Sequence, residues 1–302
     1  MKNKITAFSL IELSMVILIV GVLIIGTIMG NRLFLESRIS SAATLTQSSD
    51  VSTIKDLVAW FETTVSENIS TGSTLKTYID DGDSISSWNN YTSQSNSQYR
   101  LTQSTSTKRP LYKTNIINGL PVLKFDGVDD YFTMTNLVGR HFSLFVVIKT
   151  SAVGTTGFAY NGFPIVTSDQ SGITNDIIPL AIGGGYPETF VGNATGGSES
   201  TNTLVGSKKI NDNLAHIVFV SRNYSTGTKT IYVDGGSSVS DSITSSGIME
   251  ANSSTTIGGD IVNSKYTSIY IAEIIIFDRV LLDEERKEVE SYLSKKWGIT
   301  IS

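Results

Sequence analysis

The stretch that decides the fold runs from Asn118 to Tyr131 and reads NGLPVLKFDGVDDY. Its centre, Val122–Phe125, is a short β-type run, and Asn, Gly and Asp bound it on both sides, which is typical of a strand between turns. Asp126, Asp129 and Asp130 follow this run, and their carboxylate oxygens are candidate ligands for calcium. The alternative is a tight turn in which Asp and Gly only supply the backbone geometry.

Four further runs of the same kind extend the pattern along the chain. They are Ser143–Lys149, Ala215–Ser221, Lys229–Val233 and Ser268–Phe277. The first and last contain continuous apolar stretches, as inner strands do, and the middle two flank a hairpin connection at Asn223–Gly227. From about Val51 onward the strands are separated by turns and not by helices. The sequence therefore predicts a mainly β fold, a β-sandwich.

Several local patterns together resemble the concanavalin A-like, laminin-G-like jelly roll of bacterial surface proteins. Besides residues 118–131, the matching segments are Leu57–Phe61, Ile85–Asn89, Arg109–Pro110, His216–Val220, Ile231–Gly235, Ile271–Leu281 and Tyr292–Gly298. The resemblance covers roughly Lys55 to Ile301. It implies a concanavalin A-like jelly-roll β-sandwich, which we expect to occupy residues 51–302.

The last segment of the chain has the pattern of a short helix. Asp283 is a candidate N-cap, Glu284 and Glu285 follow in the first turn, and Lys295 and Lys296 suit the dipole of the last turn. An apolar stripe runs along one side of this helix, and a residue suited to the C-terminal cap follows it: Val289, Tyr292, Leu293, Trp297 and then Gly298. We expect this helix to pack on the sandwich.

The N-terminus is of a different kind. Residues 1–7 contain Lys2 and Lys4 and no acid, and an almost unbroken apolar run extends from Phe8 to Gly30. A bilayer span needs about 20 such residues, so we expect a transmembrane span at 8–30 within a helix at 8–50. The lysines keep the leader in the cytoplasm. Glu12 is the one ionisable residue of the run and needs a partner, because an unpaired carboxylate in a membrane is costly.

The stretch Ala7–Leu13 resembles the processing site of type IV prepilins and type II secretion pseudopilins. The resemblance implies that residues 1–7 are a leader peptide, that a prepilin peptidase cuts between Ala7 and Phe8, and that the Phe8 amine is methylated. It also implies that Glu12 neutralises the N-terminus of a neighbouring subunit during assembly. The span lacks the proline that many pilins carry. The alternative is a plain single-pass anchor.

Composition excludes several classes of function. The chain of 302 residues contains no cysteine, so disulfides, thiolate metal sites and cysteine nucleophiles are ruled out. Its net charge of −5 does not indicate nucleic-acid binding. The glucanase motif Glu-x-Asp-x-x-Glu does not occur, His216 lies in an expected strand with a structural role, and His141 has no evident partner. We therefore expect a protein that is not an enzyme and has no cofactor, calcium at residues 126–130 being the open alternative.

These observations predict a pilin-like subunit, minor or at a filament tip, whose extracellular lectin-type domain binds a carbohydrate or a surface protein. It would begin as a single-pass precursor in the bacterial inner membrane and end in a surface filament with other pilin subunits. A type II secretion pseudopilin is the alternative, and a membrane-anchored glycan hydrolase is a third hypothesis. Loop tyrosines are candidates for stacking on sugar rings: Tyr91, Tyr99, Tyr160 and Tyr186. Gly183–Gly185 is expected to be a flexible loop.

Overall fold

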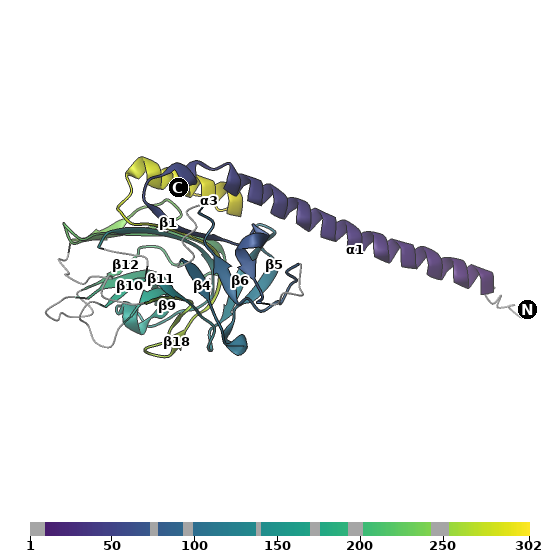
Figure 1. Cartoon of the computed structure of the whole chain (residues 1–302), viewed down its shortest axis with the longest axis horizontal. Coiled ribbons are helices and arrows are strands. Elements are labelled where there is room, and N and C mark those ends of the chain that lie inside the picture. The colour runs from purple at the N-terminus through teal and green to yellow at the C-terminus, as the bar shows by residue number, and fades with distance from the viewer. Residues whose placement is uncertain are drawn as a thin grey trace, which may run out of the picture.

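The computed structural model describes residues 10–72, 78–92, 99–136, 140–169, 176–192, 202–242 and 254–302. In this part of the chain a long helix leads into a sandwich of two β-sheets, and a short helix follows the last strand (Figure 1). Every strand pairing described is antiparallel. The prediction of a mainly β sandwich with an N-terminal apolar helix and a short C-terminal helix is confirmed.

The two sheets have the following strand orders. Sheet A contains β15 (Val239–Asp241), β14 (Thr228–Val233), β13 (Ala215–Asn223), β8 (Phe142–Lys149), β19 (Ser268–Phe277), β6 (Leu120–Asp126) and β5 (Leu111–Ile117), with β1 (Leu57–Glu62) also paired to β19. Sheet B contains β12 (Thr203–Val205), β11 (Tyr186–Val191), β10 (Ile177–Gly183), β9 (Phe163–Ser168), β16 (Ser254–Ile257), β7 (Phe132–Thr135), β4 (Arg100–Thr102), β3 (Ser87–Asn89) and β2 (Ile69–Ser70). The small pair β17 (Gly259–Asp260) and β18 (Lys265–Tyr266) and four short 3-10 helices, η1 (Asp50–Thr53), η2 (Ser66–Asn68), η3 (Ser106–Lys108) and η4 (Ala159–Asn161), complete the fold.

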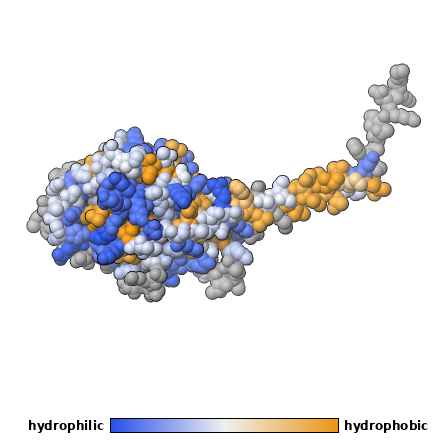
Figure 2. Space-filling model, turned by 90° about the horizontal axis from the view of Figure 1, so that it is seen from above, coloured by the Kyte–Doolittle hydropathy of each residue, from blue (hydrophilic) through white to orange (hydrophobic). Residues whose placement is uncertain are grey.

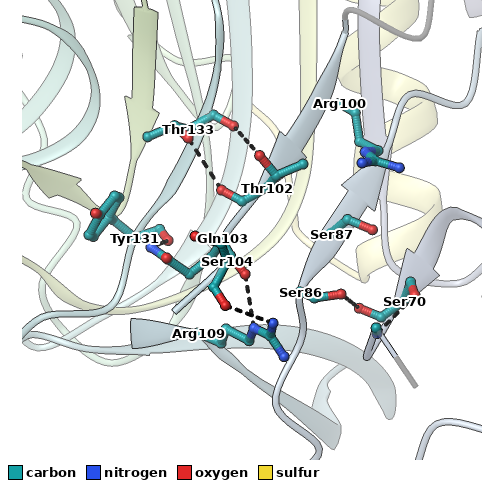
Figure 3. Close-up of a pocket in the computed structure, with 11 residues that line it drawn as sticks. Ser70, Ser86, Ser87, Arg100, Thr102, Gln103, Ser104, Arg109, Tyr131 and Thr133 are labelled. Carbon is teal, nitrogen blue, oxygen red and sulfur yellow. Dashed lines mark hydrogen bonds between the residues drawn. The ribbon is translucent and has the colours of Figure 1, made fainter. Parts of the chain in front are cut away.

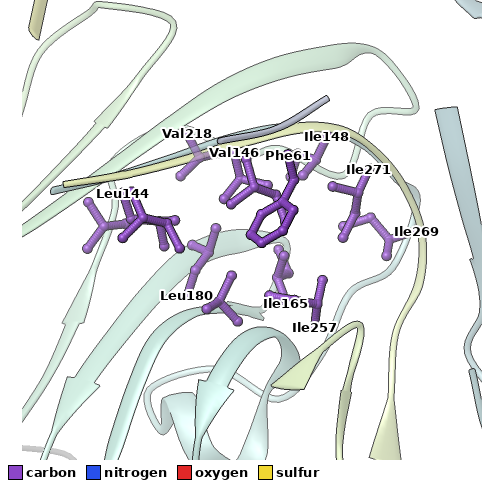
Figure 4. Packing of buried hydrophobic residues seen from close by; sticks show 14 of the residues in the cluster. Phe61, Leu144, Val146, Ile148, Ile165, Leu180, Val218, Ile257, Ile269 and Ile271 are labelled. Atoms are coloured by element: carbon purple, nitrogen blue, oxygen red, sulfur yellow. The ribbon is translucent and has the colours of Figure 1, made fainter. Parts of the chain in front are cut away.

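The main hydrophobic core lies between the two sheets. Figure 4 shows aliphatic side chains of both sheets packed around Phe61 of β1. Trp88 of β3 also reaches this layer, and its indole Nε1 donates to the carbonyl oxygen of Glu62 at 2.8 Å. This bond joins sheet B to the end of β1 in sheet A. The core therefore fixes how the two sheets lie against each other.

The outer face of sheet A carries a second core. Helix α3 (Asp283–Trp297) and the end of α1 (Leu10–Gln47) cover this face (Figure 1). Ala42 of α1, Trp60 of β1 and Trp297 of α3 are buried together in this layer. Consequently the C-terminal end of α1 is part of the folded β-sandwich, which together with α3 is called the head below.

The strand predictions are confirmed within one or two residues, and the run Ser268–Phe277 matches β19 at both ends. The hairpin between β5 and β6 turns at Asn118 and Gly119, whose φ angles of 49° and 71° are those of a type I′ turn. Gly298 ends α3 with φ of 66°, as expected.

One expectation about α3 is wrong. The N-cap is Leu282 and not Asp283, which is the first residue of the helix. The Asp283 carboxylate instead binds Arg286 at 2.6 Å and Lys287 at 2.7 Å. At the N-terminal end of the helix, Glu285 provides the side-chain acceptor: its Oε2 accepts the N–H of Leu282 at 2.9 Å. Glu285 takes over the capping role because Asp283 is already engaged with two cations.

Helix α1 has two parts with different surroundings. It extends away from the head (Figure 1), and its 38 residues correspond to about 57 Å at 1.5 Å per residue. The segment Leu10–Thr27 has a mean hydropathy of 2.6 and none of it is buried, so it is long and apolar enough to cross a membrane. Apolar side chains line the face of this segment seen in Figure 2. The helix ends at Gln47, within the range expected from the sequence.

Candidate functional site

A pocket of about 520 Å³ lies on the outer face of sheet B (Figure 3). Strands β2, β3, β4 and β7 and the loops next to them form it. The lining residues are almost all polar: Ser70, Gly72, Ser86, Ser87, Arg100, Thr102, Gln103, Ser104, Arg109, Tyr131 and Thr133. Its volume is within the range of about 300–1,000 Å³ that is usual for small-molecule sites.

Strand alternation explains why polar side chains line this pocket. In β4, Leu101 points into the core, so its neighbours Arg100 and Thr102 point outward. In β7, Thr133 lies between two core residues and also points outward. The hydroxyls of Thr102 and Thr133 donate to each other's carbonyl oxygens at 3.5 and 3.4 Å. The paired strands therefore present a polar surface to solvent on the far side of the core.

Arg109 closes the pocket by holding loop backbone. Its guanidinium donates to the carbonyl oxygens of Gln103 at 2.9 Å, Ser104 at 3.0 Å and Thr71 at 3.3 Å. The side chain of Gln103 in turn donates to the carbonyl oxygen of Tyr131 at 3.0 Å. Among the residues that the structure describes, neither Arg100 nor Arg109 forms an ion pair. The pocket thus contains two cations without a carboxylate beside them.

The acidic motif forms a tight turn, as one of the two interpretations predicted. Asp126 Oδ1 accepts the N–H of Val128 at 2.7 Å and, at longer range, those of Asp129 and Asp130. A Cβ on Gly127 would lie only 2.7 Å from the backbone nitrogen of Ser268, and φ there is +80°, so the turn needs glycine.

The same turn also brings three carboxylates together. Oxygens of Asp126, Asp129 and Asp130 lie within 4.8 Å of one another. Asp130 is 4% exposed, and burial together with the charges of Asp126 and Asp129 raises its pKa to about 7. A cation bound here would relieve that repulsion, so calcium at these three residues stays a prediction.

The two histidines have structural contacts. His216 is buried in β13, with Nδ1 2.7 Å from Asp234 Oδ2 and Nε2 2.9 Å from Asp212 Oδ1. Burial lowers its pKa, but the hydrogen bonds and charges of the two carboxylates outweigh burial, so the net shift is upward. His141, for which no partner was expected, accepts the backbone N–H of Tyr224 at 3.2 Å through Nδ1.

A buried ion cluster joins α1, β1, β19 and α3, and the sequence did not reveal it. The Lys296 ammonium has a side-chain exposure of 0% and lies 2.8 Å from Glu62 Oε2 and 2.9 Å from Glu273 Oε2. It also donates to Thr46 Oγ1 of α1 at 2.8 Å. Burial lowers the pKa of Lys296, but the two carboxylates outweigh it and raise the pKa above its ordinary value.

Aromatic donors complete this cluster. The indole nitrogens of Trp60 and Trp297 donate to the two oxygens of Glu273 at 2.6 and 2.7 Å, and the Tyr292 hydroxyl donates to Oε1 at 2.7 Å. The sequence placed Lys296 in the last turn of the helix, where the structure also has it, but did not predict that its side chain is buried. The available signal was its spacing, since Lys296 follows Tyr292 by four residues and so lies on the same side of α3 as the apolar stripe.

The loop tyrosines that were candidates for stacking on sugar rings lie in different surroundings. Tyr91 is half-buried and packs edge-on against Trp60 with ring centroids 5.0 Å apart. Tyr99 packs against the main core. The Lys209 ammonium lies 5.6 Å from the ring centroid of Tyr186. The side chain of Tyr160 lies outside the described residues. The aromatic residue of the pocket is Tyr131, which sequence reasoning did not single out.

The remaining sequence candidates are the glycine run, Glu12 and the expected cleavage site. Gly183–Gly185 is the tight turn between β10 and β11. Glu12 lies in the first turn of α1 with its side chain exposed. Ala7 and Phe8 lie outside the described residues.

Comparison with known proteins gives the fold. No protein-family model matches this chain, and no curated protein matches it in sequence. Among solved structures, it is similar to the binding domain of Paraclostridial Mosquitocidal Protein 1, with a TM-score of 0.52, 13% identity and coverage of 81% of this chain and 55% of the other. It is also similar to the ligand binding domain of Botulinum neurotoxin serotype D in complex with N-acetylneuraminic acid, with a TM-score of 0.50, 14% identity and coverage of 83% and 56%.

A third similarity, to Trypanosoma rangeli sialidase, has a TM-score of 0.44 at 14% identity and covers 80% of this chain and 33% of the enzyme. It is too low to carry an argument. The chain spans little more than half the length of the two toxin structures. At these identities the similarity shows the architecture alone: the head is a β-sandwich.

Proposed function

We propose that this protein is a membrane-anchored, pilin-like subunit that presents its sandwich as a carbohydrate-binding head. The observation that carries the proposal is α1. One uninterrupted helix is fully unburied and apolar over Leu10–Thr27 and is built into the head at its other end. Such a surface needs a lipid or protein environment, because contiguous exposed apolar area of this extent is unfavourable in water.

The junction between helix and head supports a fixed presentation. Arg38 Nη2 donates to the carbonyl oxygen of Asn118 at 2.6 Å, and the Asn118 side chain donates to the Lys296 carbonyl at 2.9 Å. A Cβ on Gly119 would lie 2.5 Å from the Arg38 guanidinium carbon, so the turn leaves room for that side chain. The β5–β6 turn therefore ties α1 to the end of α3.

The pilin part of the proposal rests on the order of sequence features. Lys2 and Lys4 precede the Ala7–Phe8 peptide bond, and Glu12 follows within the apolar run. We propose cleavage before Phe8, methylation of its amine, and pairing of Glu12 with the N-terminus of an adjacent subunit, which would offset the cost of two charges in an apolar setting. A head of this size is hard to repeat along a filament, which favours a minor or tip subunit. Use in a secretion pseudofilament is the second candidate.

The binding part rests on the pocket together with the fold. The lining offers hydroxyls and guanidinium groups suited to sugar hydroxyls. A related fold is solved with N-acetylneuraminic acid, which gives a precedent by analogy only, since one fold hosts many functions. Glycan hydrolysis canonically needs a pair of carboxylates beside the scissile bond. Neither Asp nor Glu is among the described residues that line the pocket, so binding without turnover is the better hypothesis.

Mass spectrometry of the mature N-terminus tests the anchor proposal. We expect a methylated Phe8 and no residues 1–7, and retention of Met1–Ala7 in assembled protein would contradict it. Glu12→Val should insert normally, since the span becomes more apolar, but should be lost from sheared filaments or pseudofilaments. Ser14→Ala, two residues further along α1, is the matched control and should assemble as the native protein does.

A further inference from the structure

We propose that the pocket on sheet B binds an anionic carbohydrate, a sugar that carries a carboxylate or a sulfate, and that Arg100 is the residue that contacts the anionic group. This inference rests on the proposed carbohydrate-binding function and specifies the class of ligand. Four observations support it: the charge of the pocket, the availability of donors on Arg100, the chemistry of its other side chains, and its size.

The charge of the lining is positive. Arg100 and Arg109 both line the pocket, and no Asp or Glu does. Some cations elsewhere in the described part of the chain are paired with carboxylates, as Arg279 is with Glu285 at 2.6 Å and Lys208 with Asp234 at 2.6 Å. A hollow with unmatched guanidinium groups concentrates anions, because its walls focus the field toward the opening.

The two arginines have different roles. Arg109 uses its three nitrogens on backbone carbonyls, so it shapes the pocket. Arg100 is exposed, and no hydrogen bond or ion pair of its side chain is found in the described residues. Its planar fork of N–H donors is therefore available for bidentate contact with a carboxylate or sulfate. Lys108, whose ammonium lies 5.9 Å from the Tyr131 ring centroid, adds a third positive charge near that ring.

The rest of the lining fits a polyol. It offers the hydroxyls of Ser70, Ser86, Ser87, Thr102, Ser104 and Thr133, and these can both donate and accept hydrogen bonds. No aliphatic side chain is present in the lining, which disfavours a peptide with apolar residues or a lipid chain. Tyr131 is the one aromatic residue of the lining, and its ring points away from Arg100 and Ser87 (Figure 3) and packs against Tyr266 with ring centroids 6.2 Å apart. The volume of about 520 Å³ suits a few sugar units at most.

The test measures binding to matched pairs of glycans by the full chain purified in detergent. The probes are 3′-sialyllactose against lactose, digalacturonic acid against digalactose, and galactose 6-sulfate against galactose. We expect the anionic member of at least one pair to bind about tenfold or more tightly than its neutral partner, as a charge-assisted hydrogen bond allows. That preference should weaken as salt is raised.

Variants separate the anion contact from other effects. Arg100→Gln should remove most of the preference for the anionic probe and leave the melting temperature unchanged, while Arg100→Lys should retain part of the preference. Lys287→Gln is the matched control, because it removes one exposed positive charge from α3 on the opposite side of the head. It should bind both probes as the native chain does.

Each outcome has a defined meaning. Equal binding of neutral and anionic probes, or an anionic preference that survives Arg100→Gln, would overturn this inference and leave the proposed carbohydrate-binding function standing. Binding of an acidic peptide such as hexaglutamate in place of every glycan would overturn both. No binding of any neutral or anionic probe would also contradict both, whereas the outcome of N-terminal processing is independent of all these results.

Discussion

Cations lie on the outer side of both sheets of the head. Lys296 on sheet A is paired with carboxylates, whereas the two arginines of the pocket on sheet B are not. On sheet A, the Lys296 ammonium is fully buried between Glu62 and Glu273 and receives aromatic neighbours. On sheet B, Arg100 and Arg109 line an open pocket without any carboxylate. A buried charge must be matched, because its loss of hydration costs several kcal/mol. A charge left unmatched at an open surface has no such need and is available for a ligand.

In the proposed function, the cation on sheet A stabilises the structure and the cations on sheet B recognise the ligand. The Lys296 cluster connects α1 with the head through Thr46 and should be sensitive to any change. The pocket should tolerate replacement of Arg100 with little loss of stability. Three predictions test the sheet A side of the comparison, in order of decreasing effect, and a fourth tests the acidic turn at residues 126–130.

Replacement of Lys296 by Met should lower the free energy of unfolding by about 3–5 kcal/mol, because two buried carboxylates lose their shared cation. Lys295→Met is the matched control, since Lys295 is the exposed neighbour on the same helix, and it should change stability by less than about 0.5 kcal/mol. Urea unfolding of the head measures both variants. Equal effects would mean that the cluster does not hold the head together.

Trp297→Ala should destabilise the head by about 3–4 kcal/mol, since a fully buried ring is removed and Glu273 loses a donor. Trp297→Phe keeps an aromatic ring and loses only the N–H, so we expect a smaller loss of about 1–2 kcal/mol. Thermal denaturation distinguishes the two. An unchanged melting temperature for the Ala variant would contradict the burial of this ring.

Removal of α1 should weaken the head but not abolish its fold. A fragment of residues 51–302 lacks Ala42 and Thr46, which are 3% and 1% exposed, and opens Lys296 to water. Compared with a fragment of residues 37–302, we expect a loss of about 2 kcal/mol in the free energy of unfolding. Identical denaturation midpoints for the two fragments would show that the C-terminal end of α1 does not stabilise the head.

Asp130→Asn should stabilise the head, and more so at high pH. The folded pKa of about 7 lies above the ordinary value, so the native state holds the proton more tightly and loses stability as pH rises from about 4 to 7. The Asn variant avoids this loss, and its advantage should grow by about 2–3 kcal/mol between pH 5 and pH 8. Urea titrations at both pH values measure it, and a constant advantage would refute the pKa shift.

Calcium provides a second measurement on the same turn. If residues 126–130 bind the ion, added calcium should raise the melting temperature of the native head at pH 8 and leave that of the Asn variant unchanged. A rise of equal size in both would place any bound calcium elsewhere.

Local patterns predicted five strands of sheet A, namely β6, β8, β13, β14 and β19, because each carries its own apolar run and its own turns. Ser268–Phe277 is one example, and the Asn118–Gly119 turn is another. The candidate pocket was not predicted, since Ser70, Arg100 and Thr133 meet only when β2, β4 and β7 pair across sheet B. The burial of Lys296 was not predicted for a similar reason: a helix position shows which side of the helix a residue lies on, but not that carboxylates from two distant strands, Glu62 and Glu273, lie opposite it.

The route of the chain from α1 to β2 has a mechanical consequence. Gln47 ends α1, β1 follows in sheet A, and η2 leads directly to Ser70 at the edge of the pocket. In the proposed function, a pull on a ligand held at Ser70 would therefore reach the anchor helix along a short covalent path. On the way, β1 is paired with β19 through several residues, among them Trp60 opposite Ile275, and antiparallel strands loaded along their length share the tension over many bonds at once. The rest of the sandwich lies outside this path, so the head would resist tension without its full core having to bear it.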